Sequence, residues 1–327
     1  MRFKTRLRVG RIAALLRVVQ ALQKVDRRCI LHLTPQEDDQ IRLILFPTAL
    51  SSVAAYTGLP KSYWFDGYRI ESQSGNNIGM EVDLQNLDRA LKSAAGGDAV
   101  VIKLAKKGVP VLTFDIRTAL GPILQDLPVS IMSSTRLEEC QEPDSATLQG
   151  VVLPSLANLC SVVERLKALG NHASIKTVVG ERSSFTIEAA SDAANLSASY
   201  DGIEHARHNR QNFSAPTGYP LWCADEINLC AGLEVEPSSS MGDARECEVE
   251  LEVKNFGKAL FAHQILPDQV LCYLLRNSVV VKVSAEAVQI NYHVSSRAFY
   301  ANLQSQSRVD TNQNFASVQL QIPVLAS

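Results

Sequence analysis

The stretch NLDRAL at residues 86–91 returns 169 positions later as NFGKAL at residues 255–260. The correspondence continues without a gap, because VIKLAKKGVPVLTFDI at 101–116 aligns with VLCYLLRNSVVVKVSA at 270–285. Each copy has the pattern of a strand, a turn and a second strand. A repeat of this length indicates two copies of one supersecondary unit. The chain is therefore interpreted as a doubled structure, and its function is sought in what a doubled unit can build.

The front of each half also repeats, more loosely and with a shorter offset of about 143 residues (Cys29 to His172). Hydrophobic periodicity predicts the order strand, helix, strand, strand in both halves. In the first half these elements are 2–7, 11–24, 29–33 and 41–45; in the second they are 149–153, 154–169, 172–178 and 184–189. Two helices per unit among several strands favour an α+β fold, in which helices cover one face of antiparallel sheets.

The difference between the two offsets means that the second half holds about 26 additional residues. The segment 201–246, rich in Ser, Gly, Pro and Asn, supplies them and is predicted to be a long loop. The segment 134–147 carries acidic residues and Pro143 between the halves, which is typical of a linker. We expect an N-terminal domain at 1–133, a connecting loop at 134–147 and a C-terminal domain at 148–327.

The bulk composition bounds the class of protein. The 327 residues are 46% hydrophobic and 20% charged, which is enough for two globular domains with a substantial core. A net charge of −2 argues neither for nor against a nucleic-acid partner. The seven Cys residues include no CxxC pair, which argues against a zinc ribbon and indicates reduced thiols in an intracellular protein. No apolar run reaches the roughly 18 residues of a membrane span.

Motifs of catalysis are missing from the sequence. It contains no GxxxxGK[ST], GxGxxG, HExxH or GxSxG pattern, and its six His residues are dispersed. His205 and His208 lie three apart and would share a metal ion only on a helix, so we treat them as loop residues. We expect no enzyme activity, no cofactor and no metal.

The second and fourth predicted helices carry the repeated motifs at 86–91 and 255–260. Basic residues occupy the outward face of each of the four predicted helices. A single outward Lys or Arg is most simply a solvated side chain, but the repeat would place four such helices on one surface. A row of cations there could neutralise phosphates without reading base sequence. No aromatic residues alternate with them, so stacking on single-stranded bases is not supported. The residues expected to face a DNA backbone are Arg17, Lys24, Arg89, Lys92, Arg165, Lys254 and Lys258.

Several segments together resemble a known family. The doubled unit with outward basic helices resembles the PCNA sliding clamps. The stretches MRFKTRL (1–7), MEVDLQNLDRALKSA (80–94), LPSLANLCSVVERLKALGNH (153–172) and VQLQIPVLAS (318–327) resemble more closely the Hus-one subunits of the checkpoint clamp. No single motif is diagnostic, but the set covers most of both halves.

The resemblance implies a ring in which helices line the hole and sheets lie outside. Subunits would join by pairing edge strands, expected at 111–116 and 195–200. The interface residues would be Val111, Thr113, Asp115, Asn195, Ser197 and Ser199. The resemblance also implies Rad-nine-like and Rad-one-like partner subunits, double-stranded DNA and a clamp loader. It implies recruitment of checkpoint and repair factors beside the connecting loop. It further implies a nuclear, partly cytoplasmic location and no membrane contact.

Two segments depart from the family pattern: 46–61 lacks a smooth strand, and 286–315 reads as an insertion before a final strand near Val318.

Two other readings remain open at this point. A homotrimeric replicative clamp would have the same fold and different partners. An imported two-domain enzyme or binding protein is suggested by seven Lys or Arg residues before the first acid, Asp26, because that pattern resembles a mitochondrial presequence.

Overall fold

A computed structural model describes residues 1–35, 39–47, 51–143, 149–180, 182–192, 194–207, 245–275 and 278–296. Several sequence-based expectations lie outside these residues, among them most of the long loop at 208–244, the insertion beyond residue 296 and the final strand near Val318. His208, Cys223 and Cys230 lie outside them as well.

The described part of the first half contains ten strands and four α-helices. The strands are β1 (Arg2–Leu7), β2 (Arg28–Leu33), β3 (Gln40–Leu45), β4 (Val53–Pro60), β5 (Phe65–Glu71), β6 (Ile78–Asp83), β7 (Ala99–Lys107), β8 (Val109–Thr118), β9 (Gly121–Pro128) and β10 (Ser130–Ile131). The helices are α1 (Ile12–Gln23), preceded by the short 3-10 helix η1 (Val9–Arg11), α2 (Lys61–Trp64), α3 (Leu84–Ala94) and α4 (Ser134–Glu138).

The second half repeats this order. Its strands are β11 (Gln149–Val152), β12 (His172–Val179), β13 (Ser183–Ala190), β14 (Asn195–Ile203), β15 (His205–Arg207), β16 (Arg245–Glu252), β17 (Gln269–Leu274), β18 (Ser278–Ala285) and β19 (Val288–Ser295). Its helices are α5 (Leu156–Leu166), α7 (Val253–Leu260) and the 3-10 helix η2 (Phe261–Ile265). The four long helices and the leading strands of each half lie where hydrophobic periodicity predicts them.

The two halves share one sheet topology, with every strand pair antiparallel. The order β5-β1-β7-β8-β9 in the first half corresponds to β15-β11-β17-β18-β19 in the second. The order β6-β2-β3-β4 likewise corresponds to β16-β12-β13-β14. The repeat in sequence is therefore a repeat in structure, and the predicted α+β fold of two tandem domains is confirmed.

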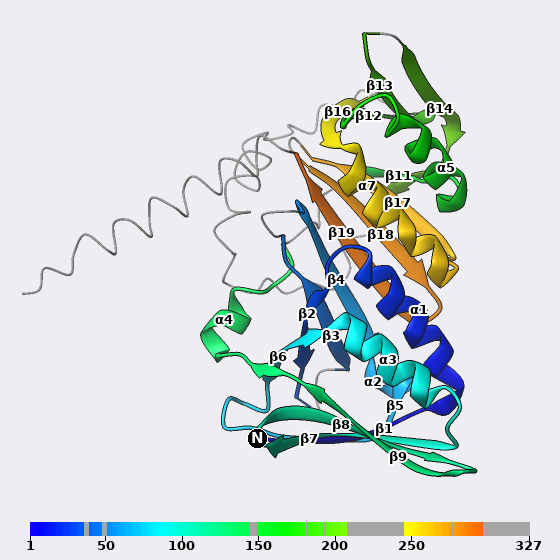
Figure 1. Ribbon diagram of the computed structural model, residues 1–327. Coiled ribbons are helices and arrows are strands. Elements are labelled where there is room, and N and C mark those ends of the chain that lie inside the picture. Colours follow the sequence, from blue (N-terminus) through cyan, green and yellow to red (C-terminus); the bar gives the residue numbers. More distant parts are fainter. Residues whose placement is uncertain are drawn as a thin grey trace, which may run out of the picture.

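The halves are joined because β4 pairs with β19. The register runs from Val53 opposite Val294 to Gly58 opposite Gln289. This pair fuses two sheets into one of ten strands, which crosses the middle of the molecule (Figure 1). Val53, Ile290 and Val294 are fully buried in an apolar core that extends through both halves.

Some local expectations were wrong. Residues 288–295 are not an insertion, because β19 is the counterpart of β9. The segment 46–61 contains the regular strand β4, and the predicted long loop is shortened at both ends by β14, β15 and β16. Residues 134–138 of the expected connecting loop form helix α4.

The basic N-terminal segment is an integral part of the fold. β1 lies between β5 and β7 in its sheet, and the apolar face of α1 contributes Ile12, Val19 and Leu22 to the core. Its cationic residues are thus the outward side of folded elements.

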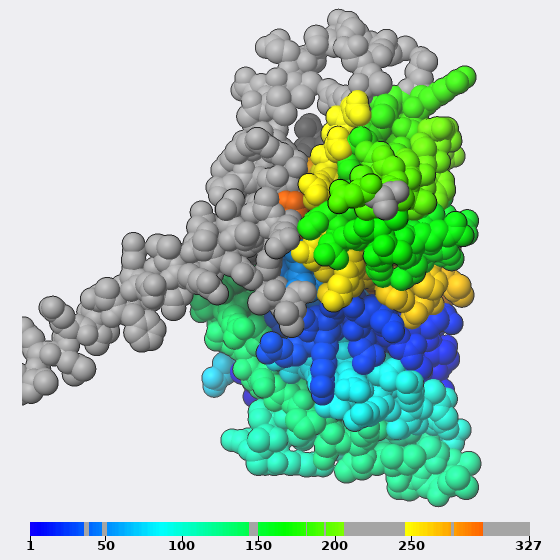
Figure 2. Space-filling model, turned by 45° about the horizontal axis from the view of Figure 1, so that its top comes forward, coloured from blue at the N-terminus to red at the C-terminus, as the bar shows by residue number. Residues whose placement is uncertain are grey.

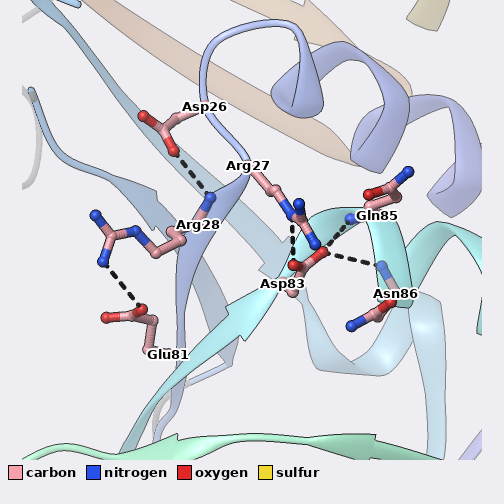
Figure 3. Close-up of polar contacts among 7 residues, drawn as sticks. All are labelled: Asp26, Arg27, Arg28, Glu81, Asp83, Gln85 and Asn86. Carbon is pink, nitrogen blue, oxygen red and sulfur yellow. Dashed lines mark hydrogen bonds and ion pairs between the residues drawn. The ribbon is translucent and has the colours of Figure 1, made fainter. Parts of the chain in front are cut away.

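Helix α3 begins at a well-formed cap (Figure 3). One oxygen of the Asp83 carboxylate accepts hydrogen bonds from the backbone N–H groups of Gln85 and Asn86, at 2.9 and 3.1 Å. The other oxygen accepts from Arg27 Nε at 2.6 Å. Partial burial by itself would raise the pKa of this carboxyl, but the bonds from Asn86, Arg27 and Gln85 outweigh it and lower the pKa.

A polar cluster lies beside the β4–β19 seam. The Asn255 side chain, at the start of α7, donates to Ser52 Oγ at 3.0 Å and to Glu252 Oε2 at 2.9 Å. Ser52 Oγ donates in turn to the carbonyl oxygen of Ser295 at 3.0 Å. Because these groups are buried, each depends on the others for its hydrogen bonds.

The Asp83→Ala variant should lower the free energy of unfolding by about 1 kcal/mol at neutral pH, because helix α3 loses its cap. Since the pKa of Asp83 is lowered by folding, this contribution is present above the ordinary pKa and disappears as pH falls below about 4. Urea unfolding at pH 7 and at pH 3 measures both effects. Glu71→Ala is the control, because the ion pair of Glu71 with Arg2 is exposed. An equal loss in both variants at pH 7 would contradict the capping role.

The Asn255→Ala variant should lower the unfolding free energy by about 1–3 kcal/mol, since it leaves buried partners unsatisfied. The repeat supplies a matched control in Asn86, which occupies the same position in α3 and whose side chain makes no hydrogen bond to the described residues. Asn86→Ala should therefore change stability much less in the same urea titration. Equal effects would show that the seam does not depend on Asn255.

Candidate nucleic-acid interface

The four long helices lie on one side of the molecule and follow one another along its length (Figure 1). α3 packs against α1, α1 against η2, and η2 against both α5 and α7. In the space-filling view the blue surface of the first half adjoins the yellow and green surface of the second (Figure 2). The repeat therefore brings helices from both halves into one continuous row.

Each helix directs an apolar side into the core and leaves a basic side in solvent. In α5, for example, Leu159, Val163 and Leu166 are buried at helical spacing, and Arg165 lies on the opposite side. Six of the seven predicted cations are exposed: Arg17, Lys24, Arg89, Lys92, Arg165 and Lys254.

These exposed cations differ in whether an ion pair neutralises their charge. Arg17, Arg89, Arg165 and Lys254 form no ion pair with any other described residue. Lys24 Nζ lies 5.4 Å from the centre of the Phe261 ring, a contact that leaves its charge available. Lys92 Nζ lies 2.6 Å from Asp88 one turn earlier, so its charge is largely compensated.

Lys258 does not share the open surface of the other six. Its Nζ donates to Ser51 Oγ at 2.6 Å, and the side chain is half-buried where α7 packs against β4 and β19. Burial, together with the nearby Lys254, lowers the pKa of this ammonium group. The structure therefore places Lys258 at the junction of the halves. Helical spacing could not show this, because the neighbour comes from a segment 207 residues away in the chain.

One further cation on this row was not predicted. Lys167, the residue that directly follows α5, forms an ion pair with Glu164 at 2.5 Å. The pair is local, and the negative charge of Glu164 neutralises the positive charge of Lys167. The row thus retains Arg17, Lys24, Arg89, Arg165 and Lys254 as available cations, drawn from all four helices. Such a row can neutralise phosphates along a backbone and has no means of reading bases.

Two of the sheet edges, β14 and β9, are the second feature of the candidate site. β14 is an edge strand, and Asn195, Ser197 and Ser199 point into solvent along it. The expectation that residues 111–116 form the other edge was wrong, because β8 lies between β7 and β9. Val111 and Thr113 are buried, and Asp115 is half-buried.

Strand β9 is the edge that sequence reasoning missed. It exposes Ile123 and Leu124, which are 44% and 59% accessible, beside the fully exposed Leu120 of the preceding turn. The structural repeat identifies this edge, because β9 is the counterpart of β19. In β19, Ile290 is fully buried where the strand pairs with β4.

Within the described part of the chain, no group of three or more His, Cys, Asp or Glu side chains could hold a metal ion. His205 lies in strand β15 rather than on a helix. The five described Cys residues are free thiols, and burial raises the pKa of Cys29 and Cys272, which disfavours the nucleophilic thiolate. The helices among the described residues include none long and apolar enough to cross a membrane.

Comparison with known proteins supports this architecture. A family model described as Hus1-like protein matches residues 1–298. The chain is 27% identical over 300 residues to the checkpoint protein hus1 homolog of Dictyostelium discoideum, covering 90% of this chain and 98% of the relative. It is 24% identical over 289 residues to checkpoint protein HUS1 of Homo sapiens, covering 85% and 92%.

Among solved structures, proliferating cellular nuclear antigen from Entamoeba histolytica matches with a TM-score of 0.61 and 13% identity, over 90% of this chain and 98% of that one. At this identity the match concerns the fold, and it agrees with the repeated topology described above. The family match extends from β1 past the end of β19, so it includes all the helices and strands that the structure describes. The chain belongs to the Hus1-like protein family.

Proposed function

We propose that this chain is a non-enzymatic subunit of a heterotrimeric DNA sliding clamp that acts in the DNA damage checkpoint. The observation that carries the proposal is the combination of one continuous cationic helix row with two free sheet edges. In this proposal a clamp loader places the ring around double-stranded DNA in the nucleus, and the ring recruits checkpoint and repair factors. Checkpoint proteins among its relatives support the same role.

The repeat supports a ring in which every joint has one geometry. Within the chain, β4 of the first half pairs with β19 of the second. β14 is the counterpart of β4, and β9 is the counterpart of β19, so each free edge is half of an equivalent joint. A neighbouring subunit would supply a strand like β9 to β14, and another would supply a strand like β14 to β9. This is pairing by strand addition at an exposed edge.

The side chains of the two edges favour a ring of unlike subunits. They are less suited to a ring made of three copies of this chain. β9 exposes Ile123 and Leu124, whereas β14 exposes Asn195, Ser197 and Ser199. At the internal joint, β4 instead presents the apolar Ala54 and Tyr56. A ring made only of this chain would place the apolar edge β9 against the hydroxyl-rich edge β14. Such a joint would bury less apolar surface than the internal joint between β4 and β19. We infer that the two partners are distinct clamp chains, of the Rad-nine-like and Rad-one-like kind.

The helix row would face the hole and hold DNA through its phosphates. Five available cations from four helices suit a duplex that slides, because contacts to phosphates position the protein without fixing a sequence. The same electrostatic origin makes retention on DNA sensitive to salt.

Changing Arg17, Arg89 and Arg165 together to Glu should weaken retention of the loaded complex on closed circular DNA and reduce its salt dependence. Each lost phosphate contact should lower the slope of log affinity against log salt by about 0.9. The measurement is the lifetime of the complex on DNA at several salt concentrations.

The matched control changes Lys4, Arg6 and Lys106 to Glu, which reverses the same number of exposed charges on strands β1 and β7. This control should retain DNA like the unaltered protein. Equal losses in both triple variants would mean that net charge, and not the helix row, governs retention.

Co-expression with Rad-nine-like and Rad-one-like chains should give a 1:1:1 complex, measured as mass in solution, and the chain alone should not form a homotrimer. Leu124→Lys should abolish binding of the partner at β9 and leave the partner at β14 bound. Ser197→Lys should have the reverse selectivity. A homotrimer of the chain alone would instead favour a replicative-type clamp, and loss of both partners from either variant would contradict the assignment of separate edges.

A further inference from the structure

A second apolar cluster lies on the outer face of the ten-stranded sheet, away from the helix row. It is formed by Ile30 of β2, Ile44 of β3, and Ala54 and Tyr56 of β4, all buried. These residues alternate along their strands with others, such as Leu43 and Ala55, that belong to the main core. The first half of the sheet is therefore apolar on both faces, and an uncovered outer face would be exposed to water.

Residues 133–143, here called the strap, cover this cluster. Helix α4 within the strap inserts Leu137, and the turn after it inserts Cys140. Gly79 of β6 makes room for the contact, because a Cβ atom there would lie 2.8 Å from Leu137 Cδ1. α4 is only five residues long, too short to be stable alone, so its position depends on what holds its two ends.

At its start the strap is continuous with β10, which pairs with β6. The Met132 N–H extends this pairing by donating to the Gly79 carbonyl oxygen at 2.9 Å. Ser133 then caps α4, with its Oγ accepting from the Arg136 N–H at 3.3 Å. This end of the strap is fixed by backbone hydrogen bonds within the first half.

At its other end Pro143 is buried, and Glu142 supplies the polar contacts from the strap to the described part of β19. Glu142 Oε1 accepts from Asn291 Nδ2 at 2.5 Å and lies 3.4 Å from His293 Nε2. His293 is buried, and its ring packs edge-on against Tyr56, with 5.3 Å between ring centres. Both partners of Glu142 lie on β19, so this contact fastens the strap to the second half of the chain.

We propose that the strap is a conformational device that closes the outer apolar cluster, with Glu142 as its fastener. Release of Glu142 from Asn291 and His293 lets Leu137 and Cys140 leave the sheet and exposes Ile44 and Tyr56. Because Asn291 and His293 both lie on β19, the strap can close only when β19 of the second half is paired with β4 of the first. The device is a property of the single chain, so its test does not depend on ring assembly.

Cys140 provides a probe of strap opening, because its thiol is buried when the strap is closed and its pKa is raised to about 11, mainly by burial. We would measure alkylation of Cys140 by N-ethylmaleimide in the full chain, resolved by peptide mass spectrometry. The readout is its rate relative to that of Cys272, which is fully buried in the main core. Glu142→Ala should raise this ratio by about three- to ten-fold, the effect expected from losing one hydrogen bond of ordinary net strength.

Glu139→Ala is the matched control. Glu139 is exposed, lies next to Cys140, and its charge also acts to raise the pKa of that thiol. Glu139→Ala also removes one carboxylate near the thiol, but it affects no contact to β19. Because the Glu139 charge is exposed and screened by solvent, this variant should leave the ratio near that of the unaltered chain. An equal rise in both variants would overturn the proposal. So would a ratio that stays constant in Glu142→Ala, including the case in which general destabilisation raises the labelling of both thiols.

Discussion

The antiparallel ladder between β4 and β19 is the interaction on which the rest of the structure depends. Without it the chain would be two domains connected by a linker, each with a free edge in the middle of the molecule. With it, six residues on each strand pair across the ladder, and the apolar cores of the halves become one. The ladder also aligns the helices of both halves, since α7 packs on both β4 and β19.

The ladder also explains why polar groups gather beside it. Ser52, Asn255 and Lys258 lie where a helix of one half meets a strand of the other, so their partners come from distant parts of the chain. Such contacts fix the relative position of the halves more specifically than apolar packing alone. A cation that enters this network is no longer available to a ligand, which is why Lys258 differs from Lys254 one turn earlier.

Sequence reasoning succeeded where structure follows from local pattern or from repetition. Helical spacing identified α1, α3, α5 and α7, and the outward position of six cations followed from it. It failed where the answer depends on which strands become neighbours. Nothing in residues 111–116 reveals that β9 covers them, and nothing in 288–295 reveals that this strand is the partner of β4. The strap contact of Glu142 with Asn291 and the contact of Asp83 with Arg27 were missed because a side chain's partner at long range leaves no trace in local periodicity.

The two outer faces show how duplicated units diverge. In the first half Ile30, Ile44 and Tyr56 face outward and need a cover. In the second half the outward residues include Lys176, which pairs with Glu188 at 2.7 Å and Glu248 at 3.5 Å, and no apolar cover is needed. A strap is therefore needed on the first half only, although the strand order is the same in both halves.

The distance along the chain between the two strands of the ladder has a consequence for biosynthesis. Val53 and its partner Val294 are separated by more than two-thirds of the sequence. While the ribosome makes the intervening residues, β4 presents an apolar edge of Val, Ala and Tyr side chains with unpaired backbone groups. An unprotected edge of this kind is prone to pair with other chains. The nascent protein must therefore be shielded until β19 emerges, and contacts so remote in sequence make the last step of folding slow.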